Sequence, residues 1–306
     1  MIGYIAWRVL QMIPVLFGIT LIVFVLLRVS GDPVSLMLGE DATEAQITQL
    51  REAYGLDRPL YKQYLIYMGD LLTGDFGRSI RYNNQLALDV VLERLPATAS
   101  LAGIALFFAT VISLPAGIIA ALYRRRIPDY VASFMSVLGQ AMPNFWLGIM
   151  LILFFSIGLG WFPVSGRDHS LAVVLPGLAL GASLAAVLTR LLRSSLIEVM
   201  NQDYIRTARA KGIGPTAVTM RHGMRNAILS YLTVIGLEAS SLMAGAVVTE
   251  QVFAWPGIGL LAIQAINSRD MAVVQTIVIL AAVIVMMINL LVDVLYSLID
   301  PRIQHG

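Results

Sequence analysis

The sequence contains no cysteine, which excludes disulfide bonds, thiolate metal sites and cysteine nucleophiles. Histidine is nearly as scarce, since only His169, His222 and His305 occur and they lie far apart in the chain. We therefore expect no histidine-rich metal site within this chain. Charged residues make up only 13% of the 306 residues, whereas a soluble domain carries about 25%. This low charge content indicates an integral membrane protein.

Motifs for nucleotide binding and for common catalytic sites are also missing. No glycine is followed by lysine, so the Gly-x-x-x-x-Gly-Lys loop that cradles nucleotide phosphates is absent. The His-Glu-x-x-His zinc motif and the Gly-x-Ser-x-Gly nucleophile motif do not occur either. A membrane enzyme would need a cluster of acid–base, metal-binding or nucleophilic groups near one interface, and none is visible. If ATP drives this protein, a partner must bind it.

Hydrophobic residues form 58% of the chain and gather in long runs that predict an all-α integral membrane protein. We place six transmembrane helices at residues 9–29, 98–123, 131–157, 171–192, 228–248 and 272–299. The first run lacks a small-residue cleavage site and is long enough to span, so we expect a retained helix rather than a signal peptide. Pro143 is expected to kink the third helix near its middle.

The basic residues predict the orientation of these helices. Arg8, Arg124 to Arg126, the loop 190–227 and Arg302 all fall on one side, which the positive-inside rule assigns to the cytoplasm. Both termini are then cytoplasmic, and the acidic region 31–97 is external.

The external region is expected to be helical. Capping and turn residues predict helices over 44–54 and 60–72, ended by Gly55 and Gly74. The second helix carries an apolar stripe of Leu60, Tyr64, Leu65, Met68, Leu71 and Leu72. That stripe can lie on the helix bundle or on lipid, or it can form a lip that meets a substrate-carrying protein.

The longest basic interruption of the second half of the chain is the stretch 203–230. Asp203 is expected to cap a helix over 204–211, Gly212 to end it in the left-handed conformation, and Gly214 with Pro215 to start a second helix. Small residues at Ala208, Ala210 and Gly212 allow close packing, flanked by Arg206, Arg209 and Lys211. Such an element can dock into a groove on a soluble partner, although a basic loop between spans can also do no more than mark the cytoplasmic side. A DNA-binding helix–turn–helix is disfavoured because membrane spans flank the stretch closely.

This stretch resembles the cytoplasmic coupling loop of ABC importer permeases, the segment that plugs into the ATPase subunit. Arg206, Thr207 and Ala208 stand where that family has Glu-Ala-Ala, and Gly212 stands at its glycine. The acidic residue is absent, as is usual in the peptide and nickel branch of the family, and the runs 206–212 and 221–227 also match that branch. The resemblance implies a coupling loop over 198–227 with the following contact residues: Asp203, Tyr204, Arg206, Thr207, Ala208, Arg209, Ala210, Lys211, Gly212, Arg221, His222, Arg225 and Asn226.

A second interruption, at residues 250–259, combines a proline and two glycines with Phe253 and Trp255. Taken alone it is an interfacial turn or a short re-entrant segment. It resembles the Glu–Phe–Trp-Pro-Gly–Gly motif of the same branch, which implies closure of the external mouth of the pathway. The implied gate residues are Glu250, Phe253, Trp255, Pro256, Gly257 and Gly259. The runs 31–33, 74–77 and 289–302 also look like markers of this branch.

Two acidic residues, Glu238 and Asp293, fall inside apparent spans. An acid in the membrane is costly, so each should face the protein interior and have a partner. For Glu238 both pathway lining and structural pairing stay open, whereas a structural role with a loop arginine is favoured for Asp293, with Asn289 one turn earlier. The pathway candidates are Met142, Asn144, Glu238, Ser241 and Gly245.

The resemblance covers nearly the whole chain and implies the type I ABC importer permease fold, with six transmembrane helices and an external helical insertion after the first. The expected parts are the first helix at 1–30, the insertion at 31–96, a core permease domain at 97–300 and a cytoplasmic tail at 301–306. The implied location is the bacterial inner membrane. Implied partners are membrane lipid, a second homologous permease subunit, two ABC ATPase subunits, and a periplasmic or lipid-anchored substrate-binding protein; no nucleic acid is expected. This chain would bind no cofactor or metal, because ATP and magnesium belong to the ATPase subunits.

The expected cargo is di- and oligopeptides, with glutathione or a nickel chelate as alternatives handled by the same architecture. A secondary transporter is less favoured because no transmembrane series of Asp, Glu and His suggests a proton relay.

Overall fold

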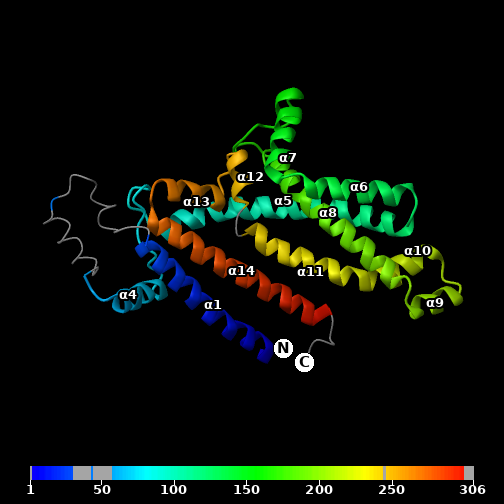
Figure 1. Cartoon of the computed structure of the whole chain (residues 1–306), viewed down its shortest axis with the longest axis horizontal. Coiled ribbons are helices and arrows are strands. Elements are labelled where there is room, and N and C mark those ends of the chain that lie inside the picture. The colour runs from blue at the N-terminus through cyan, green and yellow to red at the C-terminus, as the bar shows by residue number, and fades with distance from the viewer. Residues whose placement is uncertain (1, 30–42, 44–56, 244–245, 300–306) are drawn as a thin grey trace. The chain divides into compact units, whose positions relative to one another are not determined.

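The computed structural model describes residues 2–29, 43, 57–243 and 246–299, and the regular elements of this part are all helices (Figure 1). In chain order these are α1 (Ile2–Val29), α4 (Leu60–Leu72), α5 (Ala87–Leu122), α6 (Ile127–Ala141), α7 (Asn144–Leu151), the π-helix η1 (Ile152–Gly158), α8 (Val174–Val199), α9 (Asp203–Ala210), α10 (Pro215–Ala217), the π-helix η2 (Val218–Gly223), α11 (Met224–Met243), α12 (Val247–Val252), α13 (Ile258–Asn267) and α14 (Met271–Ile299).

The long helices match the expected transmembrane spans. Five continuous helical stretches of the described chain are long and apolar enough to cross a membrane: α1, α5, α8, α10 to α11, and α14. The remaining expected span, the third, corresponds to α6 followed by α7 and η1, which together pass the same test of length and composition. The all-α, multi-span fold class is therefore confirmed.

The third span is broken rather than kinked. Its two halves meet at 101°, with Met142 and Pro143 between them in extended conformations. Proline disfavours the helical conformation of the residue before it, which explains why α6 ends at Ala141. The expectation of a mid-helix kink was thus right in its position but wrong in its size.

The chain forms two compact units, Met1–Pro96 with Gly257–Gly306, and Ala97–Pro256. In the first unit α1 packs along α14, and α13 packs on α14. Its core joins Val91 of α5, Leu261 of α13 and Val273 of α14. An ion pair also joins α1 to α14, with 3.0 Å between Arg8 Nη2 and Asp293 Oδ1.

Helix α4 begins and ends where the sequence predicts, after Pro59 and before Gly74, whose φ is +83°. The expected helix over 44–54 lies outside the described residues. The face of α4 that packs on α1 differs from the expected apolar stripe. Tyr64 is buried edge-on against Phe17 and Phe24, whereas three stripe members remain exposed: Leu60, Leu65 and Leu72.

Burial raises the pKa of the neighbouring Tyr67 to about 12, with a further contribution from Tyr64.

Helix α8 is central to the second unit, where it packs against α6, α7 and α11 (Figure 1). Leu188, Leu192 and Leu196 of α8 are fully buried in a core that also takes Tyr231 of α11. Close approach of α8 to α5 depends on Gly181, because a Cβ there would lie 2.6 Å from the carbonyl oxygen of Ala105. This arrangement fixes where α6, α7 and α11 present their polar residues.

Candidate functional site

The stretch 203–225 folds as two short helices around a tight turn at one end of α8 and α11 (Figure 1). Helix α9 covers Asp203–Ala210, Lys211 ends it, and Gly212 takes the left-handed conformation with φ +77°. Pro215 then starts α10, as expected. The expected cap was wrong, because Gln202 occupies the capping position and Asp203 is the first helical residue.

One face of this element packs on its own chain. Ile205 and Ala208 of α9 are buried together with Val218 of η2. The side-chain amide of Asn226 donates a hydrogen bond of 2.7 Å to the Tyr204 hydroxyl, which links α9 to α11. Ala208 was expected to be available for a partner, and that expectation was wrong because it forms part of this inner face.

The opposite face is exposed and basic. The expected contact residues that lie exposed are Asp203, Tyr204, Arg206, Thr207, Arg209, Ala210, Lys211, Gly212, Arg221, Arg225 and Asn226, while His222 is half-buried. A Cβ built on Gly212 meets no atom within 4 Å, so open space surrounds the turn. An ion pair on this face joins Arg206 to Asp203 at 3.4 Å between highly exposed side chains, and such pairs stabilise little. The face is therefore available for a partner.

The expected gate residues of the second unit lie in α12 and in the tightly bonded turn that follows it. Glu250 is fully buried, and the Thr98 hydroxyl donates a hydrogen bond of 2.9 Å to its Oε1 atom. The indole N–H of Trp255 donates to the carbonyl oxygen of Ala97 at 2.9 Å. The guanidinium of Arg167 lies 5.8 Å from the Trp255 ring centroid, within the range of a cation–π contact.

The rest of the turn is packed as firmly. Phe253 is buried against the π-helix η1 and α8, and a Cβ on Gly148 would meet its ring at 2.9 Å. Pro256 is half-buried at the end of this unit. In the other unit, Gly257 precedes α13 in an extended conformation and Gly259 is buried within that helix. The turn is thus closely packed by backbone contacts and aromatic rings rather than a loose loop.

Three of the five pathway candidates lie together. Asn144, Glu238 and Ser241 line one cavity of about 390 Å³, beside Gln140 and Ser183. Met142 does not join them. It lines a larger, almost wholly apolar cavity of about 660 Å³ between α5, α6, α7 and α8. Gly245 lies outside the described residues.

Asp293 pairs with Arg8 of α1, so the expectation of a loop arginine was wrong. Asn289 lies one helical turn earlier on α14, and it also makes an interaction within the protein. Within the described ranges, no group of three His, Asp or Glu residues is placed to hold a metal ion.

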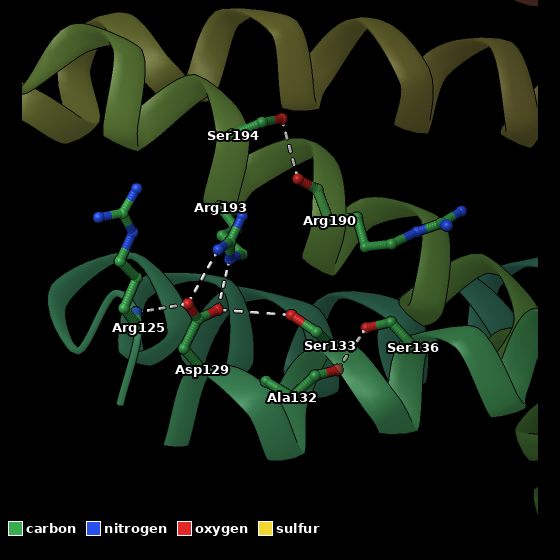
Figure 2. Close-up of polar contacts among 8 residues, drawn as sticks. All are labelled: Arg125, Asp129, Ala132, Ser133, Ser136, Arg190, Arg193 and Ser194. Atoms are coloured by element: carbon green, nitrogen blue, oxygen red, sulfur yellow. Dashed lines mark hydrogen bonds and ion pairs between the residues drawn. The ribbon is translucent and has the colours of Figure 1, made fainter. Parts of the chain in front are cut away.

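Sequence reasoning missed the ion pair between Asp129 of α6 and Arg193 of α8, which Figure 2 shows. Arg193 donates from Nε to one carboxylate oxygen and from Nη2 to the other at 2.9 Å. The Arg125 backbone N–H donates a third bond of 2.8 Å, and the Ser133 hydroxyl lies 3.4 Å away. The signal was available, since an acid and an arginine lay near the same predicted side of two spans. The pair fixes α6, which carries Gln140, to α8, which carries Ser183.

Comparison with known families matches the chain to two models along nearly its whole length. Residues 113–305 match the binding-protein-dependent transport system inner membrane component, and residues 1–102 match the N-terminal region of such membrane components.

Several named proteins are similar over the full length. The chain is 41% identical to the di/tripeptide transport system permease protein DppB of Pseudomonas aeruginosa, covering 100% of this chain and 99% of that protein. It is also 41% identical to the oligopeptide transport system permease protein AppB of Bacillus subtilis, with both chains fully covered. The glutathione transport system permease protein GsiC of Escherichia coli K12 is 40% identical, again with full coverage of both.

Two solved structures share the fold at lower identity. An inward-facing form of the MetNI methionine ABC transporter aligns with 69% of this chain and 96% of that chain, with a TM-score of 0.58 and 19% identity. An amino acid ABC transporter crystallised with histidines covers 70% of this chain and 94% of that chain, with a TM-score of 0.52 and 18% identity. The fold is thus that of the transmembrane subunits of ABC importers. From the spans, the exposed helical turn and these matches together, the chain belongs to the family of binding-protein-dependent transport system inner membrane components.

Proposed function

We propose that this chain is a permease subunit of an ATP-driven importer that carries di- and oligopeptides across the bacterial inner membrane. One observation carries the coupling part of the proposal: the exposed basic face of residues 203–225, with open space around Gly212. The full-length similarity to permeases named for di/tripeptide and oligopeptide transport supports the cargo.

The exposed basic face of residues 203–225, the coupling surface, would dock into a groove on an ABC ATPase subunit. Helix α9 is tied to α11 through Tyr204 and Asn226 and is joined by a short turn to α8. A movement of the docked element would therefore move both spans, because packed helices transmit displacement as rigid bodies. ATP and its magnesium would be bound by the ATPase, since the sequence has no phosphate-binding loop.

The complete importer would hold a second homologous permease, two ATPase subunits and a substrate-binding protein. The arginines around residues 124–126 and in the coupling element favour a cytoplasmic location for that end of the spans. Both termini would then be cytoplasmic. The turn around Glu250 and Trp255 would lie toward the outside, where its firm packing suits closure of the external mouth.

Glutathione is a second candidate cargo, since the glutathione permease of Escherichia coli is 40% identical over the full length. Glutathione is itself a small peptide-like molecule, so the two cargoes share much of their chemistry.

The test is the ATPase activity of the reconstituted importer with its binding protein, titrated separately with dipeptides, longer peptides, glutathione and a nickel chelate. Stimulation by dipeptides or longer peptides supports the proposal. Stimulation by glutathione alone supports the second candidate. Stimulation by the nickel chelate alone, or by none of the four with all subunits assembled, contradicts both.

A further inference from the structure

The cavity shared by Asn144, Glu238 and Ser241 is built from three separate parts of the second unit. The broken span contributes Gln140 from the end of α6 and Asn144 from the start of α7. Helix α8 contributes Ser183, and α11 contributes Glu238 with Ser241 one turn later. Its volume of about 390 Å³ lies at the lower end of the range of about 300–1,000 Å³ that is usual for small-molecule sites. Gln140 and Asn144 flank the break at Pro143, so both halves of the broken span contribute a polar side chain to this cavity.

The cavity lies deep within the spans. Gln140 and Glu238 are thirteen and fourteen residues from the starts of α6 and α11, which corresponds to about 20 Å at about 1.5 Å per residue. Helix α8 runs in the other direction, and Ser183 lies at a similar distance from its C-terminal end at Val199. The expected spans 131–157, 171–192 and 228–248 contain Gln140, Ser183 and Glu238, so these residues belong to the apolar stretches and not to the loops between them.

Glu238 is the acidic residue of this cavity, and its charge is not balanced there. Its side chain is half-buried, and none of the described residues donates a hydrogen bond to it or pairs with it. The cation of the region, Arg190 of α8, instead donates to Oε1 of Gln140. An intramembrane carboxylate carries an insertion cost of about 2.5–3.5 kcal/mol, so an unmatched one marks a functional site.

The chemistry of the lining residues indicates which ligand group would complement this cavity. A carboxylate is an acceptor, and an alkylammonium supplies three N–H donors with a positive charge. Asn144 and Ser241 offer a side-chain amide and a hydroxyl, which suit the backbone amide and carbonyl groups of a peptide. Gln140 and Ser183 add a second amide and a second hydroxyl, and the other lining residues are apolar, among them Leu180, Leu184 and Val187. These polar groups are complementary to the amino, amide and carbonyl groups that all peptides share.

We propose that the Glu238 carboxylate binds the free α-amino group of the peptide as it passes through this cavity. This inference rests on the proposed peptide cargo, and it assigns a chemical role to one residue of the pathway. It applies equally to glutathione, which also carries a free α-amino group.

The first test is dipeptide uptake by the complete importer in proteoliposomes, comparing the wild type with Glu238→Gln and Glu238→Asp. Glu238→Gln keeps the shape and removes the charge, and we expect uptake to fall about tenfold or more, since bonds between charged groups are strong. Glu238→Asp keeps the charge and should retain most of the uptake. Glu93→Gln, the same change at an exposed position of α5, is the matched control and should behave as the wild type.

The second test asks whether the amino group itself reaches the carboxylate, without the selectivity of the binding protein. The purified permease–ATPase complex is labelled at Glu238 with a hydrophobic carbodiimide in the presence of alanyl-alanine or its N-acetyl form. We expect protection by the free amine and little or none by the acetylated peptide. Equal protection by both forms, or by neither, overturns the inference.

Further outcomes separate this inference from the proposed function. A wild-type importer that moves the dipeptide, with Glu238→Gln moving it equally well, overturns the role of Glu238 and leaves peptide transport standing. If Glu238 only balances Arg190, the additional change Arg190→Gln will restore the uptake of Glu238→Gln, which also overturns the inference. A wild-type importer that moves no peptide or glutathione overturns both proposals.

Discussion

At the scale of single residues, two neighbouring tyrosines of α4 differ sharply in what their hydroxyls do. Tyr64 and Thr20 of α1 share a hydrogen bond of 2.9 Å. The Tyr67 hydroxyl is buried, and no partner for it is found among the residues that the structure describes. A buried hydroxyl without a partner costs about 1–3 kcal/mol, whereas a formed hydrogen bond contributes about 1 kcal/mol.

We therefore expect Tyr67→Phe to leave stability unchanged or to raise it by up to about 1 kcal/mol, because the unpaired hydroxyl is removed. Tyr64→Phe should lower stability by about 1 kcal/mol. Thermal unfolding of the two purified variants in detergent measures the difference. A larger loss for Tyr67→Phe than for Tyr64→Phe would contradict this assignment of partners.

The residue scale is also where sequence reasoning was least complete. The turn at Gly212 and Pro215 was predictable because glycine and proline have strong conformational preferences of their own. The burial of Ala208 was not, since it depends on where Val218 of a later segment packs. The separation of Met142 from Asn144 into different cavities was not predictable either, because the direction of a side chain beside a broken helix follows from the angle of the break.

At the scale of helices, the contact between α5 and α8 depends on two glycines spaced four residues apart. At Gly177 an added Cβ would meet Ile104, and at Gly181 it would meet the backbone of α5. Small residues at this spacing let membrane helices approach closely, which is a main source of helix association in lipid.

Gly181→Ala should destabilise the protein by about 1–3 kcal/mol, because the backbone oxygen of Ala105 must move away. Gly103→Ala is the matched control on α5, since a Cβ there meets nothing within 4 Å. Alanine favours helix over glycine, so the control should be neutral or stabilising by about 0.5–1 kcal/mol. Thermal unfolding of both variants checks this, and equal effects would argue against the close contact.

The ion pair between Asp129 and Arg193 makes a second prediction about helix packing (Figure 2). Asp129→Ala leaves the arginine without its partner and should cost about 3 kcal/mol, the lower end of the range for buried pairs. The lower end applies because 29% of the Arg193 side chain is exposed.

The double variant Asp129→Ala with Arg193→Met should recover much of that loss, because no uncompensated charge remains. Ser133→Ala removes only the longest contact to the carboxylate and serves as the control. The measurements are thermal unfolding and the yield of folded protein from membranes. A double variant less stable than Asp129→Ala alone would contradict this account of the pair.

The positions of the helices were the feature of this structure that the sequence predicted best. The ends of α4 could be predicted because Pro59 and Gly74 bound a helix by their own geometry. The spans could be predicted because about twenty apolar residues in a row have few other solutions in a membrane. The break of 101° at Pro143 could not, since proline determines where a helix is interrupted and the surrounding packing determines the angle.

At the scale of the whole molecule, the proposed coupling surface at residues 203–225 and the cavity lined by Asn144, Glu238 and Ser241 lie along the same helices. Helices α8 and α11 connect the two, because each borders the coupling element and each lines the cavity. The family could be recognised from separated motifs in the sequence. The grouping of Asn144, Glu238 and Ser241 in one cavity needed the structure, since they come from elements far apart in the chain.

Gly212→Asp tests the coupling surface. The left-handed conformation at φ +77° costs an aspartate about 1–2 kcal/mol, and open space surrounds the position, so the protein should fold and insert. A docked ATPase would meet the added side chain, and we expect at least tenfold less ATP-driven uptake at equal expression. Gly69→Asp, on α4 and also in open space, is the control and should transport as the wild type.

The most direct test of the central claim is uptake of a labelled dipeptide into proteoliposomes that hold the complete importer, with ATP present and the proton gradient collapsed. The account predicts sustained uptake by the wild type and loss of uptake by Gly212→Asp, with all subunits assembled in both. Uptake that stops when the proton gradient is collapsed, or equal ATP-driven uptake by both forms, would contradict it.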